Sequence, residues 1–272
     1  MKLSGKVVVI TGAGAGIGRA AARRFARRGA VLHLCDIDGA AAEAAALECA
    51  ALGARAHFHT ADCRDADAVA RLATAVLERD ALVDVLFLNA GVGHGGPIAS
   101  MSLDDWHRVL DTNLYGVVHG LHAFLPGLLE RRGGHVLVTA SMLGLFSMPS
   151  AGAYAASKHA VVALAESLRA EVRGRGVEVT ALCPGLVATD IIRGGRIDDR
   201  MDRGRLERLW QSRGADPDVV GEVAVDCVER RLGGVRLAAP TGQVFWRLRR
   251  YAPRVYERAL FMTAAVAARA GG

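Results

Sequence analysis

The sequence predicts an α/β fold with a doubly wound, seven-stranded parallel sheet flanked by helices, and three observations support it. Short β-branched runs alternate with longer Ala-, Arg- and Leu-rich segments, a pattern typical of a parallel sheet covered on both faces. A glycine-rich segment directly follows the first of these runs. At 272 residues and 51% hydrophobic content, the chain can bury one large core.

Seven segments are predicted as strands because each is short, apolar and rich in β-branched residues. They are residues 6–11, 30–36, 55–60, 83–89, 134–140, 177–184 and, with the weakest pattern, 234–240. The helical stretches between them lie near residues 17–28, 39–52, 65–79, 103–130, 151–173 and 217–231. No repeat or linker divides these elements, so we expect a dinucleotide-binding and catalytic domain over 1–240 and a C-terminal helical extension over 241–272.

The net charge of +6 is placed unevenly along the chain. Residues 1–192 hold 18 Lys or Arg and 18 Asp or Glu, whereas residues 193–272 hold 16 Arg and 10 Asp or Glu. A nucleic-acid-binding protein would more naturally carry a basic face throughout its fold. We therefore expect no nucleic-acid partner and a local reason for the basic C-terminal part.

The five cysteines are odd in number and form no C-x-x-C pair, which argues against a disulfide framework or a zinc site, and we expect no metal. The strand pattern begins by Val7, which leaves no room for a signal peptide. No apolar run approaches the roughly 18 residues that suggest a membrane span. These features predict a cytoplasmic protein.

The segment TGAGAGIG places Gly12, Gly14, Gly16 and Gly18 between the first strand and the first helix. Glycines there permit a tight turn and let backbone N–H groups and the helix N-terminus approach a pyrophosphate closely. A glycine-rich pattern alone also fits a flexible loop, but this position between strand and helix favours dinucleotide binding.

Asp36 ends the second predicted strand, 18 residues beyond Gly18. A carboxylate there can accept both hydroxyls of the adenosine ribose and would repel a 2′-phosphate, which favours NAD(H) over NADP(H). Asp36 could instead cap the next helix, although Asp38 is better placed for that role. Arg19 would favour a phosphate if it faced the cofactor, but it could equally be a solvated side chain.

Tyr154 and Lys158 are predicted to project from one helix face, because residues four apart are neighbours. Use of a tyrosine as a general base near neutrality requires its pKa to fall by roughly 3 units, or ~4 kcal/mol. An ammonium about 4 Å away supplies roughly that amount at an effective dielectric near 20, so we expect one lysine, helped by a cationic nicotinamide, to be sufficient. Lys158 is one of only three lysines among 34 Lys and Arg, and a compact ammonium can contact two ribose hydroxyls and relay a proton where a guanidinium cannot.

Ser141 lies thirteen residues before Tyr154, at the end of the fifth predicted strand, where strand ends open onto a ligand crevice. A lone serine or tyrosine in such a place is usually structural. The spacing Ser-x12-Tyr-x3-Lys after a TGxxxGxG loop is far more specific, so we interpret the three residues as one catalytic group.

With these motifs, NAG at 89–91, Asn113 in NLYG and PGLVAT at 184–189, the chain resembles the short-chain dehydrogenase/reductase family from about residue 5 to 230. The resemblance implies a Rossmann fold and hydride transfer between a nicotinamide and a carbonyl or alcohol carbon. It also implies that Tyr154 is the general acid/base, that Ser141 bonds the substrate oxygen, and that Lys158 binds the nicotinamide ribose and lowers the tyrosine pKa.

By the same resemblance, Asn113 would hold a water that links Lys158 to solvent, Asp62 would meet the adenine and Thr189 would bond the carboxamide. The residues expected to bind the cofactor are Gly12, Gly14, Gly16, Ile17, Gly18, Asp36, Asp62, Cys63, Asn89, Ala90, Gly91, Tyr154, Lys158, Pro184, Gly185, Val187 and Thr189. The family often has asparagine where this chain has Leu88, a position that we expect to face away from the cofactor.

The substrate side is predicted from the segments around the catalytic group. His94 follows the NAG motif, near the expected pocket rim. It is expected to be a surface or pocket-lining histidine without a partner, and contact with the substrate is the alternative. An apolar lining that follows Ser141 suits a lipophilic alcohol or ketone, although its residues could equally belong to the core or a subunit interface: Met142, Leu145, Phe146 and Met148. The polar, Arg-rich residues 186–215 suit a mobile lid.

The segment 247–269 holds six Arg and one Glu with aromatic residues nearby, and Pro253 could open a helix. Such a helix can lie on a membrane surface or pack on the core or a neighbouring subunit with a solvated Arg face. The sequence therefore predicts an NAD(H)-dependent enzyme, with a homodimer or homotetramer expected. An NADPH-dependent carbonyl reductase and a non-catalytic dinucleotide-binding scaffold are the alternatives.

Overall fold

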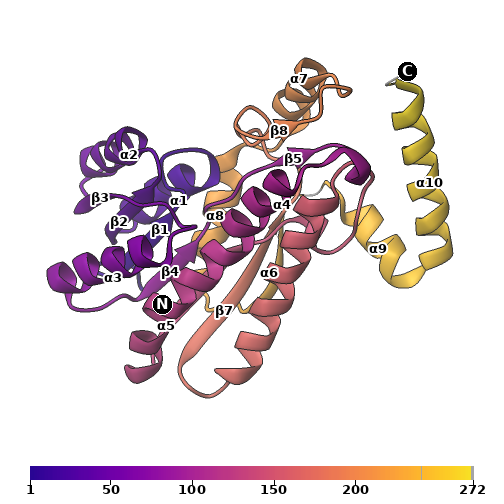
Figure 1. The fold of residues 1–272 in the computed structure, drawn as a ribbon. Helices are drawn as coiled ribbons and strands as arrows, with labels where there is room; N and C mark the ends of the chain where they lie inside the picture. The colour runs from indigo at the N-terminus through magenta and orange to yellow at the C-terminus, as the bar shows by residue number, and fades with distance from the viewer. Residues whose placement is uncertain (240, 271–272) are drawn as a thin grey trace.

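The computed structural model describes residues 1–239 and 241–270, with side chains described up to residue 263. Seven parallel strands form one sheet in the order β3-β2-β1-β4-β6-β7-β9 (Figure 1). The strands are β1 (Val7–Thr11), β2 (Val31–Asp36), β3 (Ala56–Thr60), β4 (Val85–Leu88), β6 (Gly134–Thr139), β7 (Val177–Pro184) and β9 (Gly234–Ala238). The predicted seven-stranded parallel sheet is confirmed.

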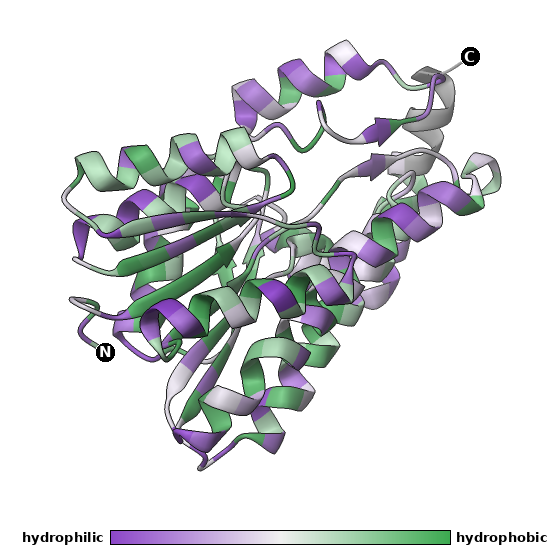
Figure 2. Ribbon diagram, turned by 60° about the vertical axis from the view of Figure 1, so that its left-hand side comes forward, coloured by the Kyte–Doolittle hydropathy of each residue, from purple (hydrophilic) through white to green (hydrophobic). Residues whose placement is uncertain are grey.

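The central strands are apolar along their whole length because both of their faces are covered. Every residue of β1, β4 and β6 is buried, and these strands are the green centre of Figure 2. This is the reason why their sequences run continuously apolar instead of alternating.

Helices cover both faces of the sheet. One face is packed by α1 (Gly16–Arg27), α2 (Gly39–Ala51) and α8 (Pro217–Glu229). The other is packed by α3 (Ala66–Asp80), α5 (Gly116–Glu130) and α6 (Gly152–Glu171). Leu88 belongs to this second face, where a Cβ on Gly120 of α5 would lie 2.3 Å from Leu88 Cδ2, so its side chain packs in the core against α5.

The strand order reverses direction at β1, which pairs with both β2 and β4. The connections leaving β1 and β4 therefore separate at the carboxyl ends of these strands, and a crevice at that edge is the place where doubly wound sheets bind ligands. Both the glycine loop after β1 and the NAG segment after β4 lie at this point.

The predicted helix 103–130 is interrupted. It consists of α4 (Leu103–Leu110), a π-helical turn η2 (Asp111–Tyr115) and α5. A π turn inserts an extra residue into the helical repeat and is frequent at functional sites. Its sequence carries no proline or glycine to mark it, so the continuous helical pattern concealed it.

The substrate-side segments contain elements that the sequence did not predict. Two-residue strands β5 (His94–Gly95) and β8 (Arg196–Ile197) pair in parallel, and α7 (Arg203–Arg213) lies within the predicted lid. Short 3-10 turns occur at η1 (Ile98–Ser100) and η3 (Met142–Gly144).

The C-terminal part forms α9 (Gln243–Tyr251) and α10 (Pro253–Ala270), so Pro253 does open a helix. Pro240, where both the last predicted strand and the predicted domain boundary end, and residues 271–272 lie outside the described residues. The division into a domain and an extension stays a prediction. Among the residues that the structure describes, no helix combines the length and the apolar character needed to cross a bilayer.

Candidate active site

The glycine loop is shaped by contacts that leave no room for larger residues. Gly12 has φ +64°, and a Cβ there would lie 2.8 Å from Ala90 Cα. A Cβ on Gly18 would lie 2.1 Å from Gly12 O. The loop therefore folds tightly against the segment after β4, while Ile17 packs its side chain against the core below.

Asn89 ties this loop to the sheet. Its Nδ2 donates to the carbonyls of Thr11 and Gly12, both at 3.1 Å, and its Oδ1 accepts from Thr139 Oγ1 at 2.9 Å. The Asn89 side chain thus forms its hydrogen bonds with β1, the glycine loop and β6. It holds these segments together beside the predicted cleft.

Asp36 lies at the end of β2 and faces the glycine loop. Its carboxylate accepts hydrogen bonds from the backbone N–H groups of Gly14 at 2.8 Å and Asp38 at 3.1 Å. Asp38, as expected, caps α2 by accepting from Ala41 N at 3.1 Å. Asp36 is therefore not the helix cap, and its partly exposed carboxylate borders the cleft.

Arg19 does not face the cleft. Its Nε donates to Glu48 Oε2 on α2 at 3.0 Å, and this bond raises the pKa of the Arg19 guanidinium. The expected solvated side chain is instead part of an ion pair between α1 and α2.

Asp62 and Cys63, which are predicted to bind the adenine end of the cofactor, lie in the segment after β3, and Cys63 contacts the π turn. The guanidinium of Arg64 binds Asp62 Oδ2 at 2.6 Å and holds the pKa of that carboxyl below its usual value. Cys63 is packed against η2, with its thiol donating to Thr112 O at 3.9 Å, and burial raises the pKa of the thiol to about 11. A neutral thiol and an already paired carboxylate border this end of the cleft.

Ser141, Tyr154 and Lys158 lie together at the carboxyl end of β6. Lys158 Nζ is 5.8 Å from the centre of the Tyr154 ring, which places both side chains on one face of α6. The Ser141 hydroxyl accepts a hydrogen bond from Leu143 N at 3.1 Å and is also close enough to Tyr154 to bond its hydroxyl. The predicted spacing thus brings the three side chains into one group.

Lys158 is almost fully buried, with 3% of its surface exposed. Its Nζ donates to Thr139 O at 2.7 Å, and a Cβ on Gly91 would lie 3.4 Å from it. Burial lowers the pKa of this amine from 10.5 to about 8. Burial of the charged Lys158 ammonium therefore lowers the stability of the folded protein.

Burial raises the pKa of Tyr154 above 10, and the hydrogen bond from Ser141 offsets only part of that rise. The Lys158 ammonium lies 5.8 Å from the centre of the Tyr154 ring, and its charge favours the phenolate, in the opposite direction to burial. That Lys158, helped by a cationic nicotinamide, brings the tyrosine pKa near neutrality stays a prediction. The sequence reasoning behind it left out the desolvation of the phenolate.

Asn113 is fully buried in the π turn beside this group. Its Oδ1 accepts from Val92 N at 2.8 Å, and its Nδ2 donates to Val92 O and Ser157 Oγ, both at 3.1 Å. Ser157 Oγ in turn donates to the Tyr154 carbonyl at 2.8 Å. Both amide hydrogens are used by protein partners, so a water at Asn113 would have to donate to one of its oxygens.

The segment after β7 closes the other side of the cleft. Gly185 N donates to Ala238 O at 2.9 Å, which continues the pairing of Pro184 with β9. Val187 is buried and pairs with Ala215. A Cβ on Gly16 would lie 3.1 Å from Thr189 Cγ2, so Thr189 stands against the glycine loop.

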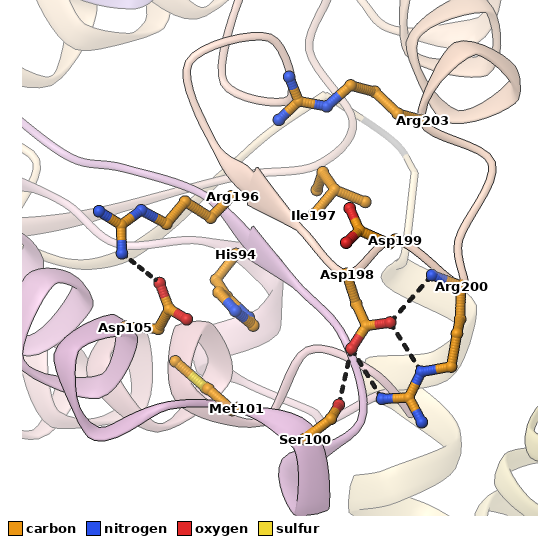
Figure 3. A pocket seen from close by; sticks show the side chains of 10 residues that line it. All are labelled: His94, Ser100, Met101, Asp105, Arg196, Ile197, Asp198, Asp199, Arg200 and Arg203. Carbon is orange, nitrogen blue, oxygen red and sulfur yellow. Dashed lines mark hydrogen bonds and ion pairs between the residues drawn. The ribbon is translucent and has the colours of Figure 1, made fainter.

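The segment predicted as a lid is bound to the rest of the chain by polar contacts that the sequence did not predict (Figure 3). Arg196 Nη1 binds Asp105 Oδ1 at 2.7 Å, and Ser100 Oγ donates to Asp198 Oδ2 at 2.7 Å. The arginine-rich composition of residues 186–215 indicated that charged contacts would form there, but it did not indicate which residues would be their partners. These contacts border a cavity of about 530 Å³, and the expected place of His94 at the rim of the substrate pocket stays a prediction. The cavity is lined by His94, Ser100, Met101, Asp105, Arg196, Ile197, Asp198, Asp199, Arg200 and Arg203. None of Asn113, Ser141, Tyr154 and Lys158 belongs to that lining.

The loop after Ser141 is held by the C-terminal helices. Tyr256 Oη donates to Ser147 O at 2.8 Å and accepts from Ser147 N at 3.0 Å. Phe146 stacks on Phe245 with 5.7 Å between ring centres. Met142 and Phe146 are buried in the core, whereas Leu145 and Met148 are only partly buried, so two of the four residues proposed for the substrate side are core residues.

Comparisons with known proteins agree with this geometry. A family model described as short chain dehydrogenase matches residues 6–199. The chain is 43% identical over 197 residues to the 1-deoxy-11-beta-hydroxypentalenate dehydrogenase of Streptomyces exfoliatus, covering 71% of this chain and 72% of that protein. It is 35% identical over 257 residues to the probable oxidoreductase EphD of Mycobacterium tuberculosis, covering 91% of this chain but only 43% of that protein.

Among solved structures, a short chain dehydrogenase/reductase from Burkholderia phymatum in complex with NAD superposes with a TM-score of 0.86. It is 34% identical, and the match covers 94% of this chain and 96% of that one. The agreement of the family model, the curated relatives and the fold shows that the chain belongs to the short-chain dehydrogenase/reductase family of oxidoreductases.

Proposed function

We propose that the protein is an NAD(H)-dependent oxidoreductase that interconverts a secondary alcohol and a ketone, with Tyr154 as the general acid/base. The observation that carries this proposal is the gathering of Ser141, Tyr154 and Lys158 beside Gly91, which borders the cleft of the glycine loop. A site of this kind can hold a carbonyl oxygen, protonate it and keep the cofactor ribose within reach.

The residues of the cleft fit a dinucleotide. A Cβ on the loop glycines would clash with backbone atoms or with the side chains of Asp36 and Thr189, so only glycine fits in this loop; the four are Gly12, Gly14, Gly16 and Gly18. The loop leads into the N-terminus of α1, which favours binding of a pyrophosphate. When bound, NAD supplies the hydride acceptor and a positively charged nicotinamide ring. In the proposed arrangement Thr189 bonds the carboxamide and Asp62 contacts the adenine. The other residues expected to bind the cofactor line the sides of the dinucleotide cleft.

The proton chemistry follows from the hydrogen bonds. Ser141 Oγ accepts from Leu143 N, so its own hydrogen, which lies near the Tyr154 hydroxyl, can turn to donate to the substrate oxygen. Tyr154 gives its phenolic proton to that oxygen on reduction and takes it back on oxidation. Lys158 uses one of its three ammonium hydrogens on Thr139 O and keeps two for ribose hydroxyls, and a water bound at Asn113 would relay protons to solvent.

We propose NAD(H) over NADP(H) because Asp36 faces the glycine loop. Its carboxylate accepts from Gly14 N, so it lies where the adenosine ribose would bind and would repel a 2′-phosphate. Arg19, which an NADPH-dependent carbonyl reductase would use, is paired with Glu48. This pairing favours the NAD(H) alternative.

A lipophilic substrate is supported by the partly exposed Leu145 and Met148 after Ser141 and by the relative that is named a dehydrogenase of a hydroxypentalenate. All five cysteines are free thiols, which suits the reducing cytoplasm that we propose as its compartment. We also propose a homodimer or homotetramer.

The test is Tyr154→Phe, with Tyr251→Phe as the matched control because Tyr251 is 75% exposed on α9. NADH binding by fluorescence should stay nearly intact in both variants. Turnover in a screen of secondary alcohols and ketones should fall at least ~100-fold in Tyr154→Phe only. Near-normal turnover in that variant would refute the mechanism, and dinucleotide binding without turnover by the unaltered protein would favour the scaffold alternative.

A further inference from the structure

Helix α10 has two apolar faces. Its inner face carries Tyr256, Ala259 and Leu260, of which Tyr256 is buried and binds Ser147. Its outer face, on the opposite side of the helical repeat, carries Val255, Phe261 and Met262. A helix that merely packs on a core has one apolar face and one polar face, so the second apolar face needs an explanation.

The outer side chains are strongly exposed. Val255, Phe261 and Met262 are 51%, 69% and 70% exposed. Scattered exposed apolar residues are ordinary, but these three lie within eight residues on one side of one helix. In Figure 1, α10 stands at the edge of the molecule, away from the helices that cover the sheet.

Arginines share this outer face. Arg254 and Arg258 are one helical turn apart, and Arg258 lies one turn from both Val255 and Met262. In the part of the chain that the structure describes, neither arginine forms an ion pair. Over residues 243–263 the sequence has five Arg and one Glu, so the face is apolar and basic together.

We propose that the outer face of α10 is a peripheral docking surface for an anionic lipid bilayer. Phe261, Met262 and Val255 would enter the boundary between head groups and acyl chains, and Arg254 and Arg258 would contact the lipid phosphates. An amphipathic helix with apolar residues flanked by arginines fits this interface. A second copy of the chain fits less well, because it would bring a second net positive surface against the first.

The magnitudes can be worked out from the charges. Each basic residue near an anionic surface changes binding about fivefold, so the loss of two changes it about 25-fold, and reversal of their charge changes it further. Replacement of Phe261 and Met262 by serine should weaken binding at least about tenfold, since each apolar side chain that enters the lipid contributes separately.

The experiment measures co-sedimentation of the full chain with vesicles of about one-third phosphatidylglycerol and two-thirds phosphatidylcholine. We expect the unaltered protein to bind these vesicles and its binding to weaken at about 0.5 M salt. Binding should fall about 25-fold or more when Arg254→Glu and Arg258→Glu are combined. It should fall at least about tenfold when Phe261→Ser and Met262→Ser are combined. The matched control is Arg173→Glu with Arg175→Glu, two exposed arginines on the turn after α6, and it should bind as the unaltered protein does.

Retained NADH binding and circular dichroism establish that each variant is folded. No binding by the unaltered protein, no preference for anionic over pure phosphatidylcholine vesicles, or an equal loss in the control pair overturns the proposal. It is also overturned if the Phe261→Ser with Met262→Ser variant has a smaller assembly mass while the unaltered protein ignores vesicles, since the face would then join two copies.

Discussion

Replacement of Lys158 by methionine should stabilise the protein while it abolishes the function. Burial lowers the pKa of the Lys158 amine from 10.5 to about 8, so the folded protein disfavours the ammonium by about 3 kcal/mol at neutral pH. Methionine fills similar space without charge, but it leaves Thr139 O without its donor, which costs about 1 kcal/mol. The expected net gain at pH 7 is about 2 kcal/mol in the free energy of unfolding.

The pH dependence identifies the cause. Between pH 8 and 10.5 the unfolded chain keeps the lysine proton while the folded chain loses it, so the stability of the unaltered protein rises with pH across this window. The Lys158→Met variant lacks this rise. Its advantage should therefore shrink from about 2 kcal/mol at pH 7 and become a deficit of about 1 kcal/mol near pH 10.5.

Urea unfolding of both proteins at equal concentration, followed by circular dichroism from pH 7 to 10.5, measures the difference. The thiols of the unfolded chain also titrate in this range, whereas burial raises the pKa of Cys35 and Cys183 to about 12 in the folded protein. Removal of the Lys158 charge can only raise the Cys183 pKa further, so both thiols stay protonated in the folded state of either protein up to pH 10.5. Their contributions therefore cancel when the two curves are subtracted. A difference that stays constant with pH, or a variant less stable at pH 7, would contradict the reasoning.

Four further changes test the cofactor site, the core, the loop after Ser141 and the lysine itself. Asp36→Asn should reduce the ratio of kcat/KM for NAD over NADP at least about tenfold, because the charge that repels a 2′-phosphate is gone; an unchanged ratio counts against the cofactor proposal. Burial lowers the pKa of His135 from 6.5 to about 3, so the unfolded chain binds a proton there as pH falls below 6.5 and the folded chain does not. About 3 kcal/mol of stability should be lost by pH 4 through this residue, and His135→Asn should show a shallower loss in urea unfolding. Tyr256→Phe removes both hydrogen bonds to Ser147 and should raise KM several-fold while kcat and the Kd for NADH hold steady; a drop in kcat with KM unchanged would show that the loop does not shape substrate binding. Lys158→Arg should keep the positive charge and still lose most turnover, because a guanidinium is broad and does not release a proton; turnover near that of the unaltered protein would show that charge alone suffices.

The sheet and the proximity of Ser141, Tyr154 and Lys158 could be predicted from the sequence because local patterns encode them. A strand such as Val7–Thr11 is apolar throughout since it is covered on both faces, and the spacing of Tyr154 and Lys158 is fixed by the helical repeat. Asp38 could be identified as a cap for the same reason, since its partner is three residues away.

The parts that the sequence did not predict depend on contacts between distant residues. The β5–β8 pair joins His94 to Arg196, and two residues per strand leave no periodic pattern. The pKa of Tyr154 is raised by burial and lowered by the neighbouring Ser141 hydroxyl, and neither effect follows from spacing alone. The bond of Tyr256 to Ser147 crosses 109 positions and has no signal in either segment.

That last contact has a consequence for the order in which the protein becomes competent during synthesis. The expected cofactor residues end at Thr189, so the ribosome has made all of them before it reaches α9. The loop after Ser141, in contrast, gains its partners Phe245 and Tyr256 only when the last helices emerge. Domains fold from the N-terminus as they are made. A chain that stops before residue 245 should therefore bind the dinucleotide, while the loop after Ser141 lacks its contacts with the C-terminal helices. We therefore expect competence for turnover to be acquired last, and we expect a truncation at the C-terminus to act on catalysis through a loop about a hundred residues upstream.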